Sequence, residues 1–292
     1  MSSVAPRHLA LLVGITLIWG LNLVANKYGV AECPPILFTL LRFAVLAAIL
    51  TPFLKIHRGQ MSPLIVAAVL SGGLNFALMI VGLSLAKNVS SVAIAGQLGV
   101  PFTTLLSVAL LGEVVRWRRW SGVALSFAGI LVMGFDPQIL QNGASVGFVI
   151  AAAFVGALGV IAVKRLQGIK PLELQAWFAW TSLPLLATLS LLIERPTWQT
   201  LSSISYVGWL AVAYTALAAS LVGHTAFYYL VQRYPVTSVA PLTNLSPVFS
   251  VVFAVLILHD QLSARLAAGG AITLLGTFII TLRERRIVDV GS

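Results

Sequence analysis

Residues 88–111 read NVSSVAIAGQLGVPFTTLLSVALL, a run of 24 residues without a single charged side chain. A helix needs about 20 consecutive, mostly apolar residues to cross the hydrocarbon core of a bilayer. The composition of the whole chain agrees with a membrane-spanning segment, because 59% of the 292 residues are hydrophobic and only 9% are charged. A soluble domain carries about 25% charged residues. A water-soluble fold of this size would leave too much apolar surface exposed, so the bilayer must solvate most side chains.

Ten segments of this kind are expected to span the membrane. The first apolar run ends at Asn26 and Lys27 without a small-residue cleavage site, so we expect a retained helix rather than a signal peptide. Proline and glycine fall between the segments and support their limits. The predicted spans are residues 9–28, 36–54, 63–85, 88–111, 120–135, 146–163, 172–193, 206–231, 236–258 and 264–282.

The basic residues predict how these spans are oriented. With the N-terminus inside, thirteen of the 18 lysines and arginines fall on the cytoplasmic side, four fall outside and Arg42 lies within the second span. Cytoplasmic loops of membrane proteins carry an excess of lysine and arginine. The distribution therefore predicts ten helices with both termini in the cytoplasm.

Composition and motifs also exclude several classes of protein. The net charge of +10 is scattered over short loops, which argues against nucleic-acid binding and suits anionic membrane lipid. The loops are too short for an extramembrane catalytic domain, and no phosphate-binding loop or H-E-x-x-H motif occurs. Cys33 is the sole cysteine, so no intramolecular disulfide is possible. We expect no metal, no cofactor, no catalytic residue and no ATPase subunit.

Part of the fourth span recurs 147 residues later in the chain. VSSVA at residues 89–93 aligns with VTSVA at residues 236–240, and the match is good in the last two helices of each half and weak in the first three. Further aligned pairs are Glu113 with Asp260, Gly122 with Gly269, and Gly129 with Gly276. The repeat divides the chain into residues 1–140 and 141–292, with five helices each. Because five is odd, the halves enter the membrane from opposite sides, an arrangement typical of secondary transporters with a midplane substrate site.

Several residues of the first half form a family pattern. They are Trp19-Gly20 followed by Asn22 and Lys27, then Leu111-Gly112-Glu113, then Gly122 and Gly129. In this pattern the chain resembles the EamA type of the drug/metabolite transporter superfamily, most of all its YddG-like amino-acid exporters of bacterial inner membranes. The resemblance implies a ten-helix carrier of two inverted repeats that exports metabolites, among them aromatic and other neutral amino acids. The second half departs from the pattern, with His259-Asp260 in place of Gly-Glu and no Trp-Gly in its first span.

Polar and aromatic side chains inside the spans are the candidates for lining a substrate cavity, because they are costly against lipid. Trp19 and Asn22 lie on one helical stripe, and Gln97 and Asn244 lie on repeat-equivalent faces. Their amides would hydrogen-bond an ammonium or a carboxylate, and the aromatic rings would bracket an apolar side chain. The predicted substrate-binding residues are Trp19, Asn22, Asn75, Gln97, Trp177, Trp180, Tyr214, His224, Tyr228 and Asn244.

Each of these assignments has a structural alternative. An interhelical hydrogen bond explains a buried Asn or Gln as well, and an interfacial aromatic belt explains Trp177. Lys27 and Arg42 lie toward the outer face, where they either attract a substrate carboxylate or extend to the lipid headgroups. The predicted hinge residues, for which a static kink is the alternative, are Pro101, Pro241 and Pro247.

The predicted function is export of small metabolites, most of all neutral or aromatic amino acids, by alternating access in a bacterial plasma membrane. No Asp or Glu falls in the middle third of a span, which favours uniport or facilitated diffusion. His224 leaves proton coupling open, so the alternative is a carrier of the same superfamily that moves drugs or other metabolites with protons. A channel lacks its filter motif here, and an intramembrane enzyme lacks a nucleophile elbow. The partners expected are a small-molecule substrate and lipid.

Overall fold

The computed structural model describes residues 5–136, 143–231, 243 and 245–281, without the side chains of residues 228 and 231. Every regular element in these ranges is helical. The α-helices are α1 (Pro6–Glu32), α2 (Pro35–Leu50), α3 (Met61–Ala68), α4 (Asn75–Leu85), α5 (Val89–Ala95), α6 (Gly99–Leu111), α7 (Trp117–Gly134), α9 (Gly143–Lys164), α10 (Pro171–Leu189), α11 (Trp198–Ser202), α12 (Tyr206–Ala213), α13 (His224–Val231), α15 (Leu245–Leu258) and α16 (Ala264–Thr281). Short 3-10 or π segments are η1 (Thr51–Phe53), η2 (Val69–Leu74), η3 (Gly96–Leu98), η4 (Ser190–Glu194) and η5 (Tyr214–Gly223).

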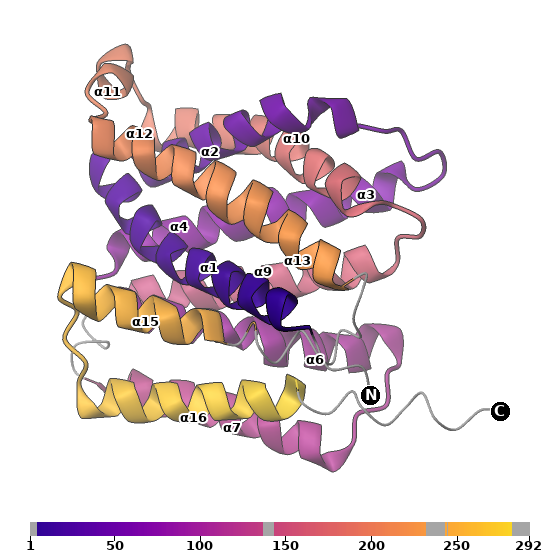
Figure 1. Cartoon of the computed structure of the whole chain (residues 1–292), viewed down its shortest axis with the longest axis vertical. Helices are drawn as coiled ribbons and strands as arrows, with labels where there is room; N and C mark the ends of the chain where they lie inside the picture. The colour runs from indigo at the N-terminus through magenta and orange to yellow at the C-terminus, as the bar shows by residue number, and fades with distance from the viewer. Residues whose placement is uncertain (1–4, 137–142, 232–242, 244, 282–292) are drawn as a thin grey trace.

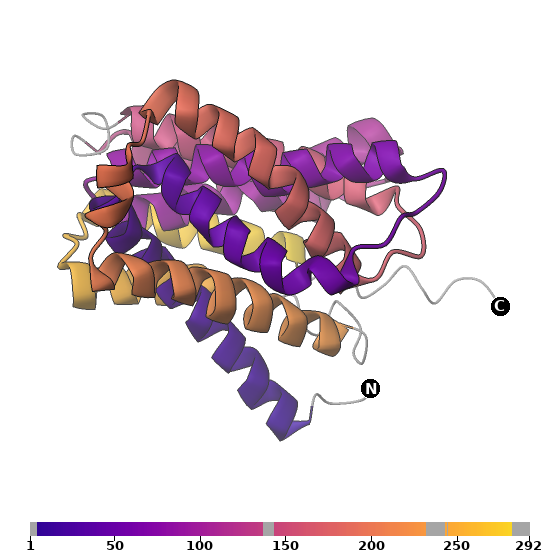
Figure 2. The ribbon, with the colours of Figure 1, turned by 90° about the horizontal axis from the view of Figure 1, so that it is seen from above.

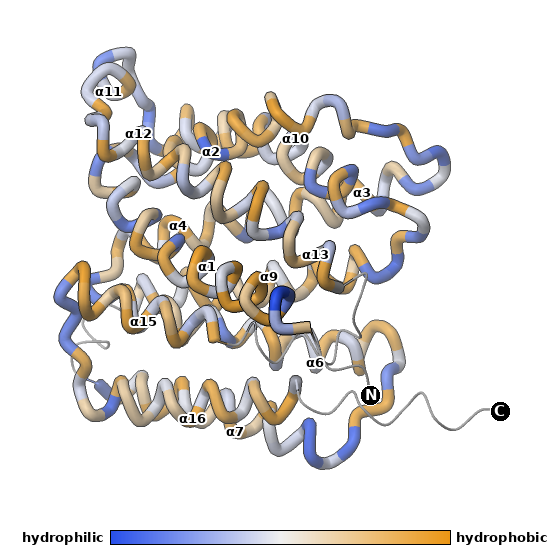
Figure 3. The backbone as a smooth tube through the Cα atoms, in the orientation of Figure 1, coloured by the Kyte–Doolittle hydropathy of each residue, from blue (hydrophilic) through white to orange (hydrophobic). Residues whose placement is uncertain are grey.

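The long helices run roughly side by side, so that their connections gather at two ends of the molecule (Figure 1). We call these ends the α11 end, on the left of Figure 1, and the opposite end, which holds the α2–α3 connection. Hydrophilic residues concentrate in the connections at both ends, and apolar residues dominate the helices between them (Figure 3). Seen from above, the first half of α1 extends away from the other helices (Figure 2). This distribution of hydropathy is that of a membrane-embedded protein.

The observed helices follow the predicted spans closely. Within the described ranges, 8 helices are long and apolar enough to cross a membrane, and Leu245–Leu258 is a shorter apolar helix. The fifth predicted span corresponds to α7, whose first turn carries Arg118 and Arg119. Residues 236–242 and 244 of the ninth predicted span lie outside the described residues. An all-helical membrane fold is thus confirmed, and the count of ten helices stays a prediction.

Two described spans contain a π turn about halfway along. The π segment η2 joins α3 to α4, and the π segment η5 joins α12 to α13. Shifted by the 147-residue repeat, η2 falls on residues 216–221, which lie inside η5. A π turn rotates the following side chains relative to a regular α-helix, and such turns are frequent at functional sites. The third helix of each half thus has the same interruption, although its sequence shows the repeat only weakly.

Glycines let α7 and α16 approach until their backbones touch. A Cβ placed on Gly122 would lie 2.8 Å from the carbonyl oxygen of Gly276, and one on Gly276 would lie 2.7 Å from that of Gly122. The same reciprocity joins Gly129 to Gly269, at 2.5 and 2.6 Å. Only residues without a Cβ allow so close a contact between helices. Because the lower number of one helix meets the higher number of the other, the two helices run antiparallel.

Candidate functional site

A cavity of about 530 Å³ lies between α4, α6, α9 and α16. Asn75, Gly96 and Ala153 line it in the middle of the helices, and Glu113 and Lys164 line it at the opposite end of the molecule. The side chains of these last two residues are 41% and 43% exposed, so the cavity reaches the surface there. Its size is within the range of small-molecule sites. We call it the large cavity.

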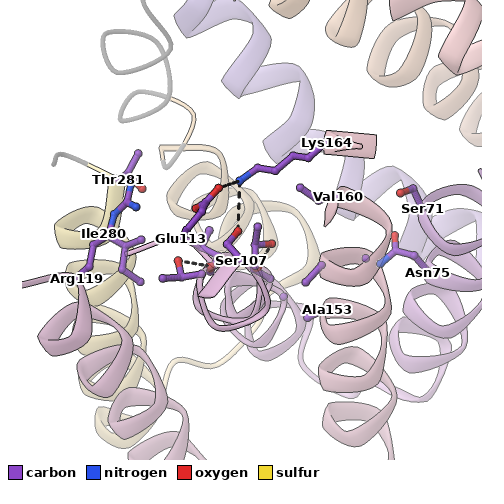
Figure 4. A pocket seen from close by; sticks show the side chains of 17 residues that line it. Ser71, Asn75, Ser107, Glu113, Arg119, Ala153, Val160, Lys164, Ile280 and Thr281 are labelled. Atoms are coloured by element: carbon purple, nitrogen blue, oxygen red, sulfur yellow. Dashed lines mark hydrogen bonds and ion pairs between the residues drawn. The ribbon is translucent and has the colours of Figure 1, made fainter. Parts of the chain in front are cut away.

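Charged groups from three helices or their connections meet where the large cavity reaches the surface (Figure 4). The Lys164 ammonium lies 3.2 Å from a carboxylate oxygen of Glu113 and donates a 3.3 Å hydrogen bond to the Ser107 hydroxyl. Arg119 lines the same region. Since Lys164 and Glu113 are both partly exposed, this ion pair is worth little stability. With two basic residues and one carboxylate, this opening is polar and carries an excess of positive charge, and the interior behind it is lined mostly by small residues.

Among the described residues that were predicted to bind substrate, Asn75 lines the large cavity. It is the first residue of α4, directly after the π turn η2, and its side-chain amide donates a 2.7 Å hydrogen bond to the carbonyl oxygen of Ala152. A Cβ on Gly156 would lie 2.7 Å from the Asn75 amide nitrogen, so glycine at this position of α9 leaves room for the amide. Asn75 therefore makes an interhelical bond while its side chain borders the cavity.

A second cavity of about 140 Å³ is lined by Arg42. Its polar lining residues are Arg42, Ser71, Gln175, Ser220 and His224, and the rest are apolar or aromatic. Arg42 is only 4% exposed and donates a 2.7 Å hydrogen bond to the Ser220 hydroxyl. That hydroxyl in turn donates to the carbonyl oxygen of Thr215, five residues earlier in the π segment η5. We call this the Arg42 cavity; Ser71 lines both it and the large cavity.

Three other predicted residues join α1 to the eighth span. The Trp19 indole donates a 3.1 Å hydrogen bond to the carbonyl oxygen of Ala219, and its ring centroid lies 5.2 Å from that of His224. The Tyr214 hydroxyl donates to the carbonyl oxygen of Ile18 at 3.0 Å. Of these three residues, His224 lines the Arg42 cavity. Trp19 and Tyr214 make hydrogen bonds between α1 and the eighth span.

The remaining predicted residues lie apart from both cavities or outside the described part. The Trp177 indole donates to the Lys55 carbonyl oxygen at 2.8 Å, and that of Trp180 donates to the Thr51 hydroxyl at 3.2 Å, both toward the α2–α3 connection. The side-chain oxygen of Asn22 is buried without a partner, and Gln97 is half-buried in η3. Outside the described residues lie Asn244, Pro241 and the side chain of Tyr228.

Of the two described hinge candidates, Pro101 is the third residue of α6, directly after the 3-10 turn η3, and Pro247 lies in α15; both are buried. Because η3 joins α5 to α6 without a break, Pro101 lies inside a continuous helical span, where its ring removes one backbone hydrogen bond. The change to 3-10 geometry precedes the proline, at Gly96–Leu98. Bending at these positions stays a prediction.

The α11 end is held together by carboxylates that accept hydrogen bonds at the starts of other helices. Each of these contacts joins a residue before position 137 to one after position 142. The carboxylate of Glu32 accepts from the Ser205 amide (3.3 Å), that of Asp136 from the Ser263 hydroxyl, that of Glu194 from the Ile36 and Leu37 amides (2.6 and 2.8 Å), and that of Asp260 from the Ser90 amide and hydroxyl (2.7 and 2.9 Å). A carboxylate beside a helix N-terminus is stabilised by the unpaired amides and by the helix dipole. Four such contacts close this end of the molecule.

Of the polar residues that line the two cavities, Asn75 and His224 are among the predicted substrate-binding residues, and the others are not. Lys164 is the last residue of α9 and Glu113 lies two residues after the end of α6, and both have the pattern of ordinary surface charges. For Arg42 the sequence allowed two interpretations, attraction of a substrate carboxylate or extension to the lipid headgroups. Its burial and its hydrogen bond to Ser220 exclude the second. Gln175 lies within a span without a repeat partner. A charged residue inside a predicted span was the signal for Arg42, whereas Gln175 lies near the start of its span and gave no such signal.

Comparison with known proteins adds independent information. The EamA-like transporter family matches residues 7–135 and again residues 143–282. The "Probable amino-acid metabolite efflux pump" of Escherichia coli (strain K12) is 29% identical over 97% of this chain and 98% of its own length, and the protein of the same name from Salmonella typhimurium has the same identity and coverage. The "Uncharacterized inner membrane transporter YedA" of Escherichia coli is 25% identical over 82% of this chain and 79% of its own. A solved structure titled "Crystal structure of protein" shares the fold, with a TM-score of 0.65 at 21% identity over 96% of this chain and 98% of its own.

Proposed function

Because the chain belongs to the EamA-like transporter family, we propose that it is a secondary transporter that exports small metabolites, most of all neutral and aromatic amino acids. The names of the two efflux pumps support this class of cargo. The membrane is the bacterial inner membrane, as in the name of the YedA relative. The sequence resemblance to this family is confirmed, and with it membership of a class of membrane transporters.

Alternating access is supported by the difference between the α11 end and the opposite end of the molecule. Four carboxylates tie the two halves together at the α11 end, whereas the large cavity reaches the surface at the opposite end. A carrier that works by alternating access exposes its site to one side while the other side is closed. With both termini in the cytoplasm, the α11 end faces outward and the large cavity opens to the cytoplasm, where an exporter takes up its cargo.

The α7–α16 contact supports two inverted five-helix repeats, residues 1–140 and 141–292. In a two-fold contact, if position i of one unit meets position j of the other, then j also meets i. Gly122 and Gly129 are repeat-equivalent to Gly269 and Gly276, and the contacts are Gly122 with Gly276 and Gly129 with Gly269. This is the reciprocity that a two-fold axis between α7 and α16 requires. Because the two helices are antiparallel, that axis is perpendicular to them.

The distribution of carboxylates supports transport down the substrate gradient. All six described Asp and Glu residues lie at the two ends of the molecule and have partners there, and the other two in the chain lie beyond residue 281. Proton-coupled carriers commonly use a carboxylate inside the membrane as the proton relay. We therefore propose uniport or facilitated diffusion. His224 at the Arg42 cavity keeps one alternative, a proton-coupled carrier of drugs or other metabolites.

The test is efflux from proteoliposomes loaded with one radiolabelled amino acid at a time, with and without a pH gradient. We expect protein-dependent efflux of phenylalanine or another neutral amino acid that the pH gradient does not alter. The absence of flux for every neutral amino acid contradicts the cargo, and a rate that follows the gradient contradicts uniport.

A pair of variants tests whether the large cavity is the route. Thr103 lines it, and Thr103→Trp would place a bulky ring in its interior. Leu110 lies on the same helix and is 47% exposed, so Leu110→Trp makes the matched change away from the cavity. Efflux should stop in the first variant and continue in the second. Equal rates in both would place the route elsewhere.

A further inference from the structure

Arg42 is a buried cation without a counter-ion in the described part of the chain. It lies in the second span, is 4% exposed, and its Nε is buried with no hydrogen-bond partner. Its guanidinium carbon lies 4.6 Å from the centre of the Phe76 ring and 5.9 Å from that of Phe43. Aromatic faces attract a cation but do not neutralise it. An unpaired charge at this depth is costly, and intramembrane ionisable groups of this kind mark ligand sites.

No carboxylate of the described chain is placed to neutralise this guanidinium. Glu194 and Glu32 hold helix starts at the α11 end, as Asp136 and Asp260 do. At the opposite end, the Glu173 carboxylate lies 2.9 Å from the Lys55 ammonium, and that of Glu113 is paired with Lys164. The missing negative charge must therefore come from outside the described chain.

The Arg42 cavity also has an excess of hydrogen-bond donors. Besides the Arg42 Nε, the amide nitrogen of Gln175 and the hydroxyl of Ser71 are buried without partners. Guanidinium and amide nitrogens only donate, and a hydroxyl donates to any strong acceptor. Three donors and no anion around one cavity are complementary to a carboxylate, which accepts several hydrogen bonds and pairs with a guanidinium in a planar fork.

The rest of the cavity wall fits the apolar part of a ligand. Phe43, Phe76 and Phe178 line it beside Leu46 and Leu50. The guanidinium is held between the rings and the Ser220 hydroxyl, so its orientation is set before any ligand binds. Preorganisation of this kind raises affinity, because less side-chain freedom is lost on binding.

We propose that the Arg42 cavity is the carboxylate subsite for the transported solute, with Arg42, Ser71 and Gln175 as its donors. The inference rests on the proposed function, since it assigns one end of an amino-acid substrate to this site. Ser71 lies in the π turn η2 and borders both cavities, so the two cavities are neighbours on either side of this serine. The cavity of about 140 Å³ accepts a carboxylate and little else, which leaves the larger part of the solute in the large cavity.

The first test uses the unmodified protein and two probes that differ in one group. Phenylacetate and phenylacetamide have nearly the same shape, but only the first carries a charge. Their affinities for the full chain in detergent are measured by the shift in thermal unfolding, with sodium chloride as a third probe. Charge-assisted hydrogen bonds to a fixed guanidinium predict about tenfold to hundredfold tighter binding of phenylacetate than of the amide. Equal binding overturns the proposal, and chloride as effective as phenylacetate assigns the site to small inorganic ions instead.

The second test locates the effect. Arg42→Gln should abolish the preference for phenylacetate, and Arg42→Lys should keep part of it, since lysine retains the charge but loses the planar fork. Arg265→Gln is the matched control, because Arg265 is an exposed arginine at the α11 end that donates to the Phe135 carbonyl oxygen. The preference should persist in this control. If Arg42→Gln fails to fold, the comparison of probes on the unmodified protein still decides.

The two proposals can fail separately. If the unmodified protein moves no amino acid in liposomes but prefers phenylacetate through Arg42, the carboxylate site stands and the cargo is wrong. If amino acids are exported and Arg42→Gln transports phenylalanine with unchanged KM, the site is wrong and the export function stands.

Discussion

Removing the Asp260 carboxylate is expected to open the α11 end of the molecule. Asp260 accepts two hydrogen bonds from Ser90, one from its amide and one from its hydroxyl, and Ser90 is fully buried at the start of α5. A hydrogen bond to a charged group is worth about 1.5–3 kcal/mol, and the lower value applies because Asp260 is partly exposed. Asp260→Ala therefore removes about 3 kcal/mol from the closed state.

Cys33 reports this opening without any introduced label. It lies between α1 and α2 at the same end, is 7% exposed, and burial together with the nearby Glu194 and Glu32 raises the pKa of its thiol to about 12. A loss of 3 kcal/mol changes the ratio of open to closed molecules about 150-fold. Maleimide labelling that requires opening should accelerate by up to that factor in Asp260→Ala, and by about tenfold in Asp260→Asn, which keeps one acceptor.

Glu113→Ala is the matched control for this experiment. Glu113 is the repeat-equivalent of Asp260 but lies at the opposite end, where it pairs with Lys164. Its removal should leave the labelling of Cys33 unchanged. Two results would refute the reasoning: an unchanged rate in Asp260→Ala, or the same acceleration in Glu113→Ala.

Three further predictions concern the helix contact, the thiol and the large cavity. Gly276→Val should cost about 3 kcal/mol, the upper end for overpacking, because the added atoms meet backbone; the thermal unfolding temperature should fall, whereas Gly134→Val, with no atom within 4 Å of the added Cβ, should leave it nearly unchanged. Any labelling of Cys33 that takes place in the closed conformation should rise about tenfold per pH unit from pH 7 to 9, since a thiol pKa near 12 keeps the thiolate rare throughout this range; a plateau near pH 9 would show that the reacting thiol is an exposed, ordinary one. Asn75→Leu, which removes the bond to the Ala152 carbonyl oxygen, should slow phenylalanine efflux at least tenfold while the protein still folds; an unchanged rate removes Asn75 from the site.

Much of the fold could be predicted from the sequence because a bilayer leaves few options for a long apolar segment. The limits of 63–85, 172–193 and 264–282 differ from the observed helices by no more than two residues in the described part. The fifth span begins at Trp117 rather than at residue 120, because its first turn accepts arginines that a hydropathy pattern excludes. Even the glycines that bring α7 and α16 together were visible as repeat pairs.

The site was less predictable, because cavity lining depends on which helices become neighbours. Trp177 and Trp180 follow the pattern of a substrate aromatic, yet their indoles bond to the α2–α3 connection. Arg42 becomes a site residue only when α10 and η5 bring Gln175 and Ser220 to it, over more than 130 residues of sequence. The π turns η2 and η5 also rotate the residues that follow them, so a regular helical periodicity misplaces these side chains.

The glycine contact between α7 and α16 has a consequence for the origin of the chain. Two identical five-helix proteins with opposite orientations in one membrane can associate through a surface that is complementary to its own inverted copy. We infer that a fused gene preserves such an antiparallel homodimer, with the former subunit boundary near residue 140. Residues 1–140 and 141–292 produced as separate polypeptides in one cell should therefore find each other through this surface, and a bulky residue at Gly129 should prevent their assembly.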